Sequence, residues 1–259
     1  MIIDMHGHIF GSNLEQDQRE VLETIDRYGI DLAFLSAIEL TNQVPNEEET
    51  DRLNAAQYAF EAAHPQHIRS YCRVNIVNKN AVEVARRGIY GHNVVGLKFL
   101  SECYMDDHRA DPVVEEAIKA NIPILIHTSH KAKGPGVPMY PLESHSGHIA
   151  NLAARYPEAK IIMAHTGGNA YLAVKNVKNH PNVAVDISGS LMRYGALEYT
   201  VKHLGAKRVL FGSDFPYVPF AVCIGKVQDA ELSEGIKEDI LYKNALRIYD
   251  KTWKAGDPL

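Results

Sequence analysis

Short apolar runs alternate with amphipathic segments along the whole chain. Apolar residues at helical spacing predict a helix over Glu15–Tyr28, which ends at Gly29. The next run, Asp31–Ala37, is short and almost continuously apolar, as in a strand buried on both faces. The same alternation predicts further strands over His67–Asn75, Val94–Phe99, Ile124–His127, Lys160–His165, Asn182–Ile187 and Arg208–Asp214, with Ile2–His8 as the first. It predicts helices over Glu47–Ala63, Asn80–Ile89, His145–Tyr156, Ala170–Asn179 and Tyr194–Leu204, a helix opened by Asp111-Pro112, and two helical stretches after residue 216.

Eight strands that alternate with helices indicate an α/β protein with a parallel sheet. No change of composition divides the 259 residues, and a closed eight-stranded barrel needs roughly 250 residues. We therefore expect a single (β/α)8 TIM-barrel domain over residues 1–259. The rival is a doubly wound open sheet. It is disfavoured because the turn Gly7-His8-Ile9-Phe10-Gly11 lacks the Gly-x-Gly-x-x-Gly pattern.

Composition narrows the class of partner. The chain is 46% hydrophobic and 23% charged, with a net charge of -5, which argues against nucleic acid or anionic membrane as the main partner. Three widely spaced cysteines indicate no disulfide framework and fit a reducing cytoplasm. There is no basic N-terminal region and no apolar run near the roughly 20 residues of a membrane span. The oligomeric state stays open, with a homodimer among the options.

The first strand carries the candidate chemistry. His6 and His8 are two residues apart, so a strand projects both imidazoles from one face, as half of a transition-metal site. Such a pair alone is common and often has no function. Its weight comes from Lys98, His127, His165 and Asp214, which stand at the ends of later strands and would meet His6 and His8 at one mouth of a barrel. Nitrogen ligands with one carboxylate favour Zn²⁺, with Mn²⁺ or Fe²⁺ as alternatives.

These residues lie in motifs that resemble the metal-dependent amidohydrolase superfamily. Within it, the nearest branch is the amidohydrolase 2 group, which includes decarboxylases similar to aminocarboxymuconate semialdehyde decarboxylase. The order and placement of the motifs carry the resemblance, which extends from residue 2 to Asn244–Tyr249. The motifs are His6-x-His8 after Ile-Ile-Asp, Gly96-Leu97-Lys98, Ile126-His127-Thr128, Ala164-His165-Thr166-Gly167-Gly168 and Gly212-Ser213-Asp214-Phe215-Pro216.

The resemblance implies a set of roles. His6, His8, His127 and Asp214 would bind the principal metal. His165 would bind a second metal or face the substrate as an acid or polarising group. Lys98 would either be carbamylated and bridge two metals or contact the substrate directly. The implied cofactor is one or two Zn²⁺ ions, and the implied catalytic residues are Asp214, His165 and Lys98.

The expected reaction is hydrolysis of an amide, ester or lactone bond. A bound cation lowers the pKa of water from about 15.7 to about 7, and Asp214 would take the proton and pass it to the leaving group. The alternative is a non-oxidative decarboxylase of a small carboxylic acid, favoured by a single metal and an unmodified Lys98. A barrel without activity is the third option.

The substrate is expected to be a small, anionic molecule. Its contacts could include Arg73, His130, Lys131, Lys133 and Arg193, although each of these is more typical of solvated surface. Two acids complete the candidates. Asp186 follows an apolar strand and could line the mouth, and Asp4 could orient a metal ligand. His145 and His148 are expected at the start of an outer helix.

Overall fold

The structure, a computed structural model, describes residues 1–39, 42, 44–130, 142–189 and 193–249. Eight parallel strands stand in sequence order in one sheet, which confirms the predicted α/β barrel. The strands are β1 (Ile3–Phe10), β2 (Leu32–Ile38), β3 (Ile68–Arg73), β4 (Gly96–Phe99), β5 (Ile124–Ile126), β6 (Ile161–Met163), β7 (Val183–Asp186) and β8 (Val209–Leu210).

The two ends of the sheet meet through backbone hydrogen bonds. Met5 N donates to Phe211 O at 3.0 Å, and farther along His8 N donates to Phe215 O at 2.7 Å. Between these, Asp214 N donates to His6 O at 2.7 Å. The chain after β8 therefore runs beside β1 and closes the barrel, which brings Asp214 next to the two histidines of β1.

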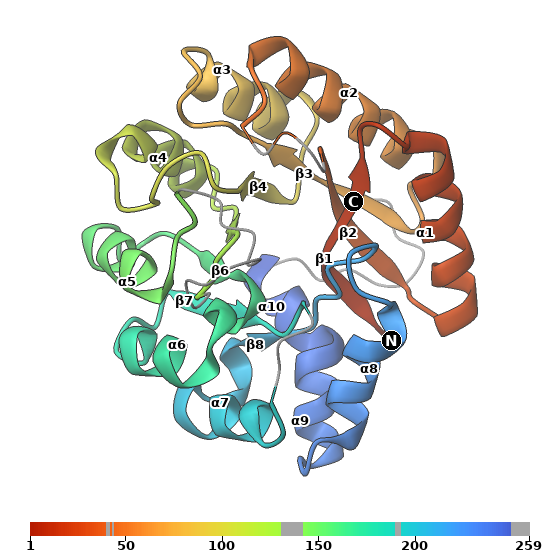
Figure 1. Ribbon diagram of the computed structural model, residues 1–259, viewed down its shortest axis with the longest axis vertical. Coiled ribbons are helices and arrows are strands. Elements are labelled where there is room, and N and C mark those ends of the chain that lie inside the picture. The colour runs from red at the N-terminus through yellow and green to blue at the C-terminus, as the bar shows by residue number, and fades with distance from the viewer. Residues whose placement is uncertain (40–41, 43, 131–141, 190–192, 250–259) are drawn as a thin grey trace, which may run out of the picture.

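Helices surround the barrel (Figure 1). The α-helices are α1 (Leu14–Tyr28), α2 (Glu47–Ala63), α3 (Ala81–Arg86), α4 (Asp111–Lys119), α5 (Ser146–Arg155), α6 (Ala170–Val177), α7 (Ala196–Leu204), α8 (Phe220–Asp229), α9 (Glu234–Glu238) and α10 (Asn244–Tyr249). Shorter turns of 3₁₀-helix cover His108–Ala110, Ala164–Gly168 and Ala206–Arg208, and turns of π-helix cover Arg87–Gly91 and Asp239–Lys243.

The two faces of the strands meet separate cores. In β2, Leu32 and Phe34 belong to the cluster inside the barrel, whereas Ala33 and Leu35 belong to the cluster under the helices. Residues two apart on a strand point to the same side, so this division follows the pleat. Continuous apolar runs in the sequence were therefore the correct signal for barrel strands.

β1 differs from the prediction at its end. The sequence predicted a strand that ends at His8, but β1 continues to Phe10. It continues because β2 offers a partner for the extra residues: Ile9 pairs with Ala37 and Phe10 with Ile38. His6 and His8 are thus held inside a paired strand rather than at its free end.

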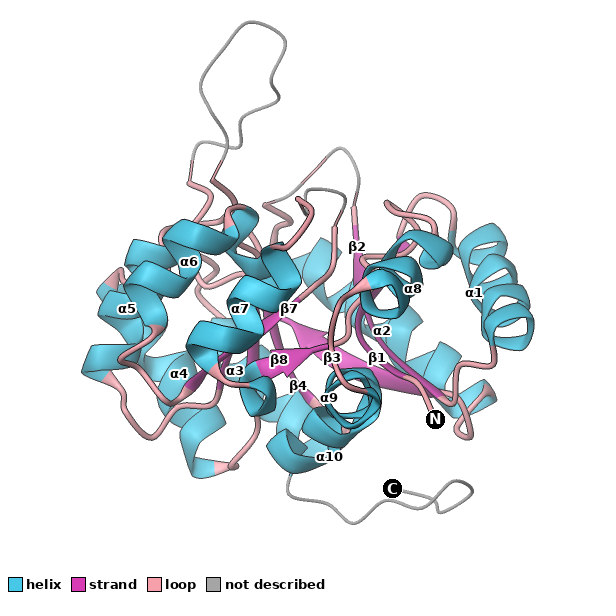
Figure 2. Ribbon diagram, turned by 90° about the horizontal axis from the view of Figure 1, so that it is seen from below, coloured by secondary structure: helices cyan, strands magenta, loops and turns pink. Residues whose placement is uncertain are grey.

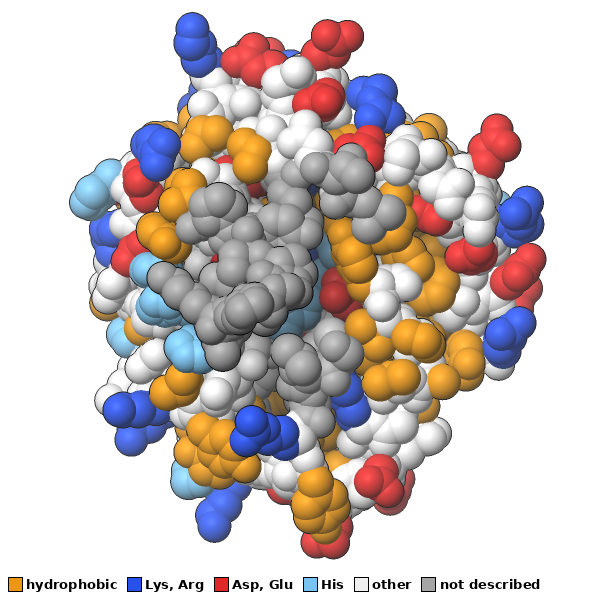
Figure 3. Space-filling model, viewed as in Figure 1, with side chains coloured by type: hydrophobic (Ala, Val, Ile, Leu, Met, Phe, Trp, Pro, Cys, Tyr) orange, Lys and Arg blue, Asp and Glu red, His pale blue; other side chains and the backbone are white. Residues whose placement is uncertain are grey.

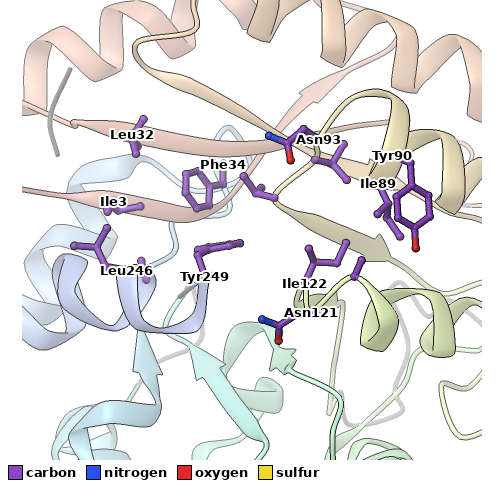
Figure 4. Close-up of a pocket in the computed structure, with 14 residues that line it drawn as sticks. Ile3, Leu32, Phe34, Ile89, Tyr90, Asn93, Asn121, Ile122, Leu246 and Tyr249 are labelled. Carbon is purple, nitrogen blue, oxygen red and sulfur yellow. The ribbon is translucent and has the colours of Figure 1, made fainter. Parts of the chain in front are cut away.

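The two ends of the barrel have different chemistry. The carboxyl ends of the strands point to the upper side of Figure 2, and α10 covers the lower end. A cavity of about 450 Å³ lies at the lower end, where Phe34, Ile122 and Tyr249 are among the side chains that line it (Figure 4). Among the residues that the structure describes, those that line this cavity include no histidine, acid or lysine. No helix in the described ranges is long and apolar enough to cross a membrane.

Candidate metal centre

Two side chains from β1 and one from the segment after β8 face one point. Nε2 of His6 lies 3.1 Å from Nε2 of His8. Oδ1 of Asp214 lies 3.6 Å from Nε2 of His6 and 3.4 Å from Nε2 of His8. These ligand atoms form one of the groups in the described part of the chain that are compact enough to hold a metal ion.

The other ring nitrogens of the two histidines fix their tautomers. Nδ1 of His8 lies 3.2 Å from the carbonyl oxygen of Ser36, which can only accept, so this nitrogen carries the proton. Nδ1 of His6 donates in the same way to Oδ2 of Asp186 at 2.9 Å. Both Nε2 atoms therefore present lone pairs to each other and to Asp214. A carboxylate behind a histidine is the usual support of a metal ligand.

This arrangement fits a divalent cation. A cation about 2.1 Å from each of three ligands, at tetrahedral or octahedral angles, separates those ligands by about 3.0–3.4 Å. The three separations here, 3.1, 3.4 and 3.6 Å, lie at or just above that range. Two lone pairs and a carboxylate oxygen in a buried site repel one another unless a positive charge lies between them. His6, His8 and Asp214 can thus hold a divalent metal.

A positively charged side chain of the protein, Lys98, contacts this cluster. Its Nζ donates to Nε2 of His6 at 2.7 Å, and its side chain is fully buried. Burial lowers the pKa of Lys98 to about 8, although the nearby Asp214 and Asp186 oppose that shift. Lys98 is therefore still mostly protonated at neutral pH.

The histidines and acids are in the protonation states that ligation requires. Burial lowers the pKa values of His6 and His8 to about 4 and that of His165 to about 3. Burial alone would raise the pKa of Asp214, but its neighbours His165, His8 and His6 hold that pKa well below its usual range. At neutral pH the imidazoles are neutral and the carboxylate is ionised.

A hydrogen-bonded chain leads from this cluster to the two remaining histidines. Nε2 of His165 lies 3.2 Å from Nδ1 of His127, whose Nε2 donates to Oε1 of Glu143 at 3.0 Å. On the other side, Nδ1 of His165 lies 2.9 Å from Oγ of Ser188. Nδ1 of His165 is also 4.0 Å from Oδ2 of Asp214. His165 thus borders the cluster, whereas His127 lies one contact farther out.

Backbone strain accompanies these positions. Among the described residues other than glycine, five have a positive φ, and three of them are His165 (57°), Thr166 (45°) and Asp214 (63°). Such a conformation costs about 1–3 kcal/mol for a residue with a Cβ, and it persists where the surrounding structure holds it. At Asp214 the support includes Asp4, whose carboxylate accepts from N and Oγ of the preceding Ser213. Burial raises the pKa of Asp4 to about 7.

Other candidates from the sequence lie elsewhere. Arg73 was predicted to be solvated or to bind a substrate carboxylate, but it is fully buried and forms an ion pair with Glu102. His130 and Arg193 are exposed, and Lys131 and Lys133 lie outside the described residues. His145 caps the N-terminus of α5, as expected for the start of an outer helix.

Three contributors to the site were not singled out in the sequence: Ser36, Ser188 and Glu143. Ser188 stands two residues after Asp186, so an Asp-x-Ser pattern at a strand end could have indicated it. Ser36 is an ordinary polar residue within an apolar strand. Glu143 stands in a long irregular segment, and no local pattern marks it.

One side of the mouth is aromatic. Tyr217, which is 44% exposed, packs its ring 4.9 Å from Phe10 and 6.1 Å from the ring of His8. Figure 3 looks onto this end of the barrel, where hydrophobic side chains gather next to histidine and acidic side chains. A planar apolar group could lie against this wall while a polar group reaches the cluster.

Comparison with known proteins agrees with this class of site. The sequence pattern of the amidohydrolase family matches residues 3–251. The chain therefore belongs to the amidohydrolase family of enzymes. None of the curated proteins matches the sequence.

Solved structures share the whole fold at low sequence identity. One is 2,6-dihydroxybenzoate decarboxylase from Rhizobium, with a TM-score of 0.81, 18% identity, and coverage of 96% of this chain and 98% of that chain. A second is a dihydroxybenzoic acid decarboxylase from Polaromonas, with bound manganese and the inhibitor 2-nitroresorcinol (TM-score 0.81, 17% identity, 98% of each chain). A third is 5-carboxyvanillate decarboxylase from Sphingomonas paucimobilis (TM-score 0.76, 19% identity, 97% and 99%).

Proposed function

We propose that this protein catalyses the metal-dependent, non-oxidative decarboxylation of a small carboxylic acid. The observation that carries the proposal is Lys98, a buried and mostly protonated amine whose Nζ points at the group formed by His6, His8 and Asp214. The hydrolysis expected from the sequence needs a base next to a cation. Decarboxylation also needs an acid, and Lys98 is the group at this cluster that can provide one at neutral pH.

His6, His8 and Asp214 would hold one divalent cation, with Mn²⁺ and Zn²⁺ as the ions to test. When bound, the cation would withdraw negative charge from the substrate. The ligand role of His127 stays a prediction, because its Nε2 donates to Glu143. The second compact group, His6, His165 and Asp186, is bridged by the hydroxyl of Ser188, so we assign it to support rather than to a second ion.

Lys98 would act in two stages. Its ammonium first turns from His6 to the substrate carboxylate, since a bound cation repels it. The bond between the carboxylate and its carbon then breaks, CO₂ leaves, and the electron pair stays on the carbon. Nζ of Lys98 transfers a proton to that carbon and regains one from water. Burial lowers the pKa of Lys98 below that of an ordinary lysine, which favours release of this proton.

The aromatic wall supports an aromatic acid as the first substrate class to test. Phe10 and Tyr217 place two rings beside His8, where the ring of a benzoate would bury its apolar faces. The solved structures of similar fold include decarboxylases of dihydroxybenzoate and of 5-carboxyvanillate. We extend this substrate class to the chain as part of the proposal.

Hydrolysis is the second candidate, and one observation favours it. Oδ1 of Asp214 faces the two Nε2 atoms, while Oδ2 points toward His165 at 4.0 Å. An ionised oxygen in this position could accept a proton from water. In that reaction Lys98 would have no proton to deliver.

The test is to follow CO₂ release from a panel of hydroxybenzoates, including 2,6-dihydroxybenzoate and 5-carboxyvanillate, with Mn²⁺ or Zn²⁺ present. A parallel panel contains esters, lactones and amides. In D₂O the product should carry one deuterium at the carbon that lost its carboxylate. The variant Lys98→Met should keep its metal by elemental analysis and lose at least 100-fold in kcat. The surface variant Lys202→Met is the control.

Turnover of an ester, lactone or amide by both the native chain and Lys98→Met, without CO₂ release from any acid, would establish hydrolysis instead. Intact mass decides the state of Lys98. An adduct of carbamate on Lys98 would contradict its role as an acid.

A further inference from the structure

Ser188 joins the two histidines that flank the cluster. Its Oγ lies 3.0 Å from Nδ1 of His6 and 2.9 Å from Nδ1 of His165, and it donates to Oδ1 of Asp186 in a short hydrogen bond. Ser188 is 4% exposed, so water does not compete freely for these contacts. A hydroxyl at this point contacts both rings at Nδ1, while Nε2 of His6 faces His8 and Nε2 of His165 faces His127.

The backbone beside Ser188 lies tightly against His165. Gly189 has φ +79°, and a Cβ at this residue would be 3.0 Å from Nδ1 of His165. That separation is closer than ordinary van der Waals contact, and the conformation itself disfavours side chains. A shift of the segment Ile187–Gly189 toward His165 would therefore push directly against the His165 ring.

Lys226 holds this segment from the outside. It stands on α8, and its Nζ donates to the carbonyl oxygens of Ile187, at 2.9 Å, and of Gly189. These two carbonyls flank Ser188 on the chain. One turn earlier on α8, Sγ of Cys223 lies 3.3 Å from the carbonyl oxygen of Ser213, next to Asp214. Helix α8 thus reaches the ends of both β7 and β8 behind the cluster.

We propose that Lys226 is a positioning residue of the metal centre. By binding the two carbonyls that flank Ser188, it places the Ser188 hydroxyl between His6 and His165 and so fixes the direction of both imidazoles. This inference rests on the proposed function for the roles of the cation and of His165. A lysine that only anchors α8 to the barrel would affect stability and leave the imidazoles unchanged, which provides the distinction to test.

The experiment compares Lys226→Met, Lys226→Arg and Ser188→Ala with the control Lys202→Met, each as the full chain loaded with Zn²⁺. Imidazole ¹⁵N NMR reports which ring nitrogen carries the proton. We expect Lys226→Met and Ser188→Ala to change the Nδ1 signals of His165 and His6. Zinc affinity, measured by chelator competition, should fall about 10-fold in both variants. Lys226→Arg should restore most of the affinity, since a guanidinium can also bind two carbonyls.

With any acid that is turned over, Lys226→Met should lower kcat about 10-fold and change KM less than 3-fold. The proposal is overturned if Lys226→Met lowers thermal stability while the imidazole signals and zinc affinity match those of Lys202→Met. If Lys226→Met does not fold, imidazole signals and zinc affinity in Ser188→Ala that match those of Lys202→Met overturn it equally. The NMR and zinc measurements need no substrate, so they stand even if no acid is decarboxylated and the proposed function fails.

Discussion

At the scale of single residues, the site depends on which nitrogen of each histidine is free. His6 and His8 are useful as ligands because Asp186 and Ser36 occupy their Nδ1 atoms. That leaves both Nε2 lone pairs on the same side as Asp214. A neighbour that changed either hydrogen bond would turn a lone pair into a donor without moving the ring. The supporting residues therefore matter nearly as much as the ligands.

Asp186→Asn tests this dependence. The asparagine amide can accept from Nδ1 of His6 only through its oxygen, because its nitrogen is a donor. The substitution also removes the negative charge that favours a proton on Nδ1 of His6. We expect metal affinity to fall 10- to 100-fold while the fold persists. Chelator competition measures the affinity, and Asp229→Asn, at an exposed position on α8, is the control. Equal affinities for the two variants would show that Asp186 does not support His6.

At the scale of elements, hydrophobic patterning predicted the number, type and order of the barrel strands. Helix α2 was predicted with the bounds that it has, Glu47–Ala63, because its start and end carry clear local signals. The strand ends were less predictable. β1 extends to Phe10 because β2 pairs with it, and a strand partner is a tertiary property that no local pattern contains.

The site residues also divide into those that the sequence could place and those that it could not. His6, His8 and Asp214 could be brought together from the sequence because strand order in a barrel determines which ends meet. The contacts of His127 and Arg73 could not, because each depends on an acid from an irregular segment. Glu143 bonds to His127, and Glu102 pairs with Arg73. Local periodicity places neither acid, so their partners appear only in the folded chain.

The start of α2 provides a prediction confined to one element. Oδ1 of Asn46 accepts from Glu49 N at 2.9 Å, and Oε2 of Glu49 accepts from Asn46 N at 2.9 Å. Asn46→Ala removes this capping box and should lower the free energy of unfolding by about 1 kcal/mol, with metal affinity unchanged. Urea unfolding measures the change. Asn13→Ala is the matched control because Asn13 precedes α1 without a side-chain cap bond. An equal loss in both variants would contradict the assigned role of the cap.

At the scale of the whole molecule, several ionisable groups at the mouth have protonation states in the folded protein that differ from those in the unfolded chain. His6, His8 and His165 are neutral in the folded protein down to pH values near 4, while Asp4 stays protonated up to about pH 7. These shifts act in opposite directions on stability. Their sum determines how the metal-free protein responds to acid.

The sign follows from proton counting. Between pH 6.5 and 4.5 the unfolded chain gains protons on three histidines that the folded chain leaves neutral, so each contributes stability above pH 6.5 that is lost as pH falls. Asp4 opposes this, because the folded state holds a proton that the unfolded state has released. Three protons against one leave a net loss in the free energy of unfolding of about 3 kcal/mol for each pH unit of acidification, at about 1.4 kcal/mol per proton.

Urea unfolding of metal-free protein at several pH values measures this slope. His165→Gln should reduce the slope by about one proton, whereas His203→Asn, at an exposed site, should not change it. Stability that stayed level or rose on acidification would mean that these imidazoles are not neutral in the folded protein.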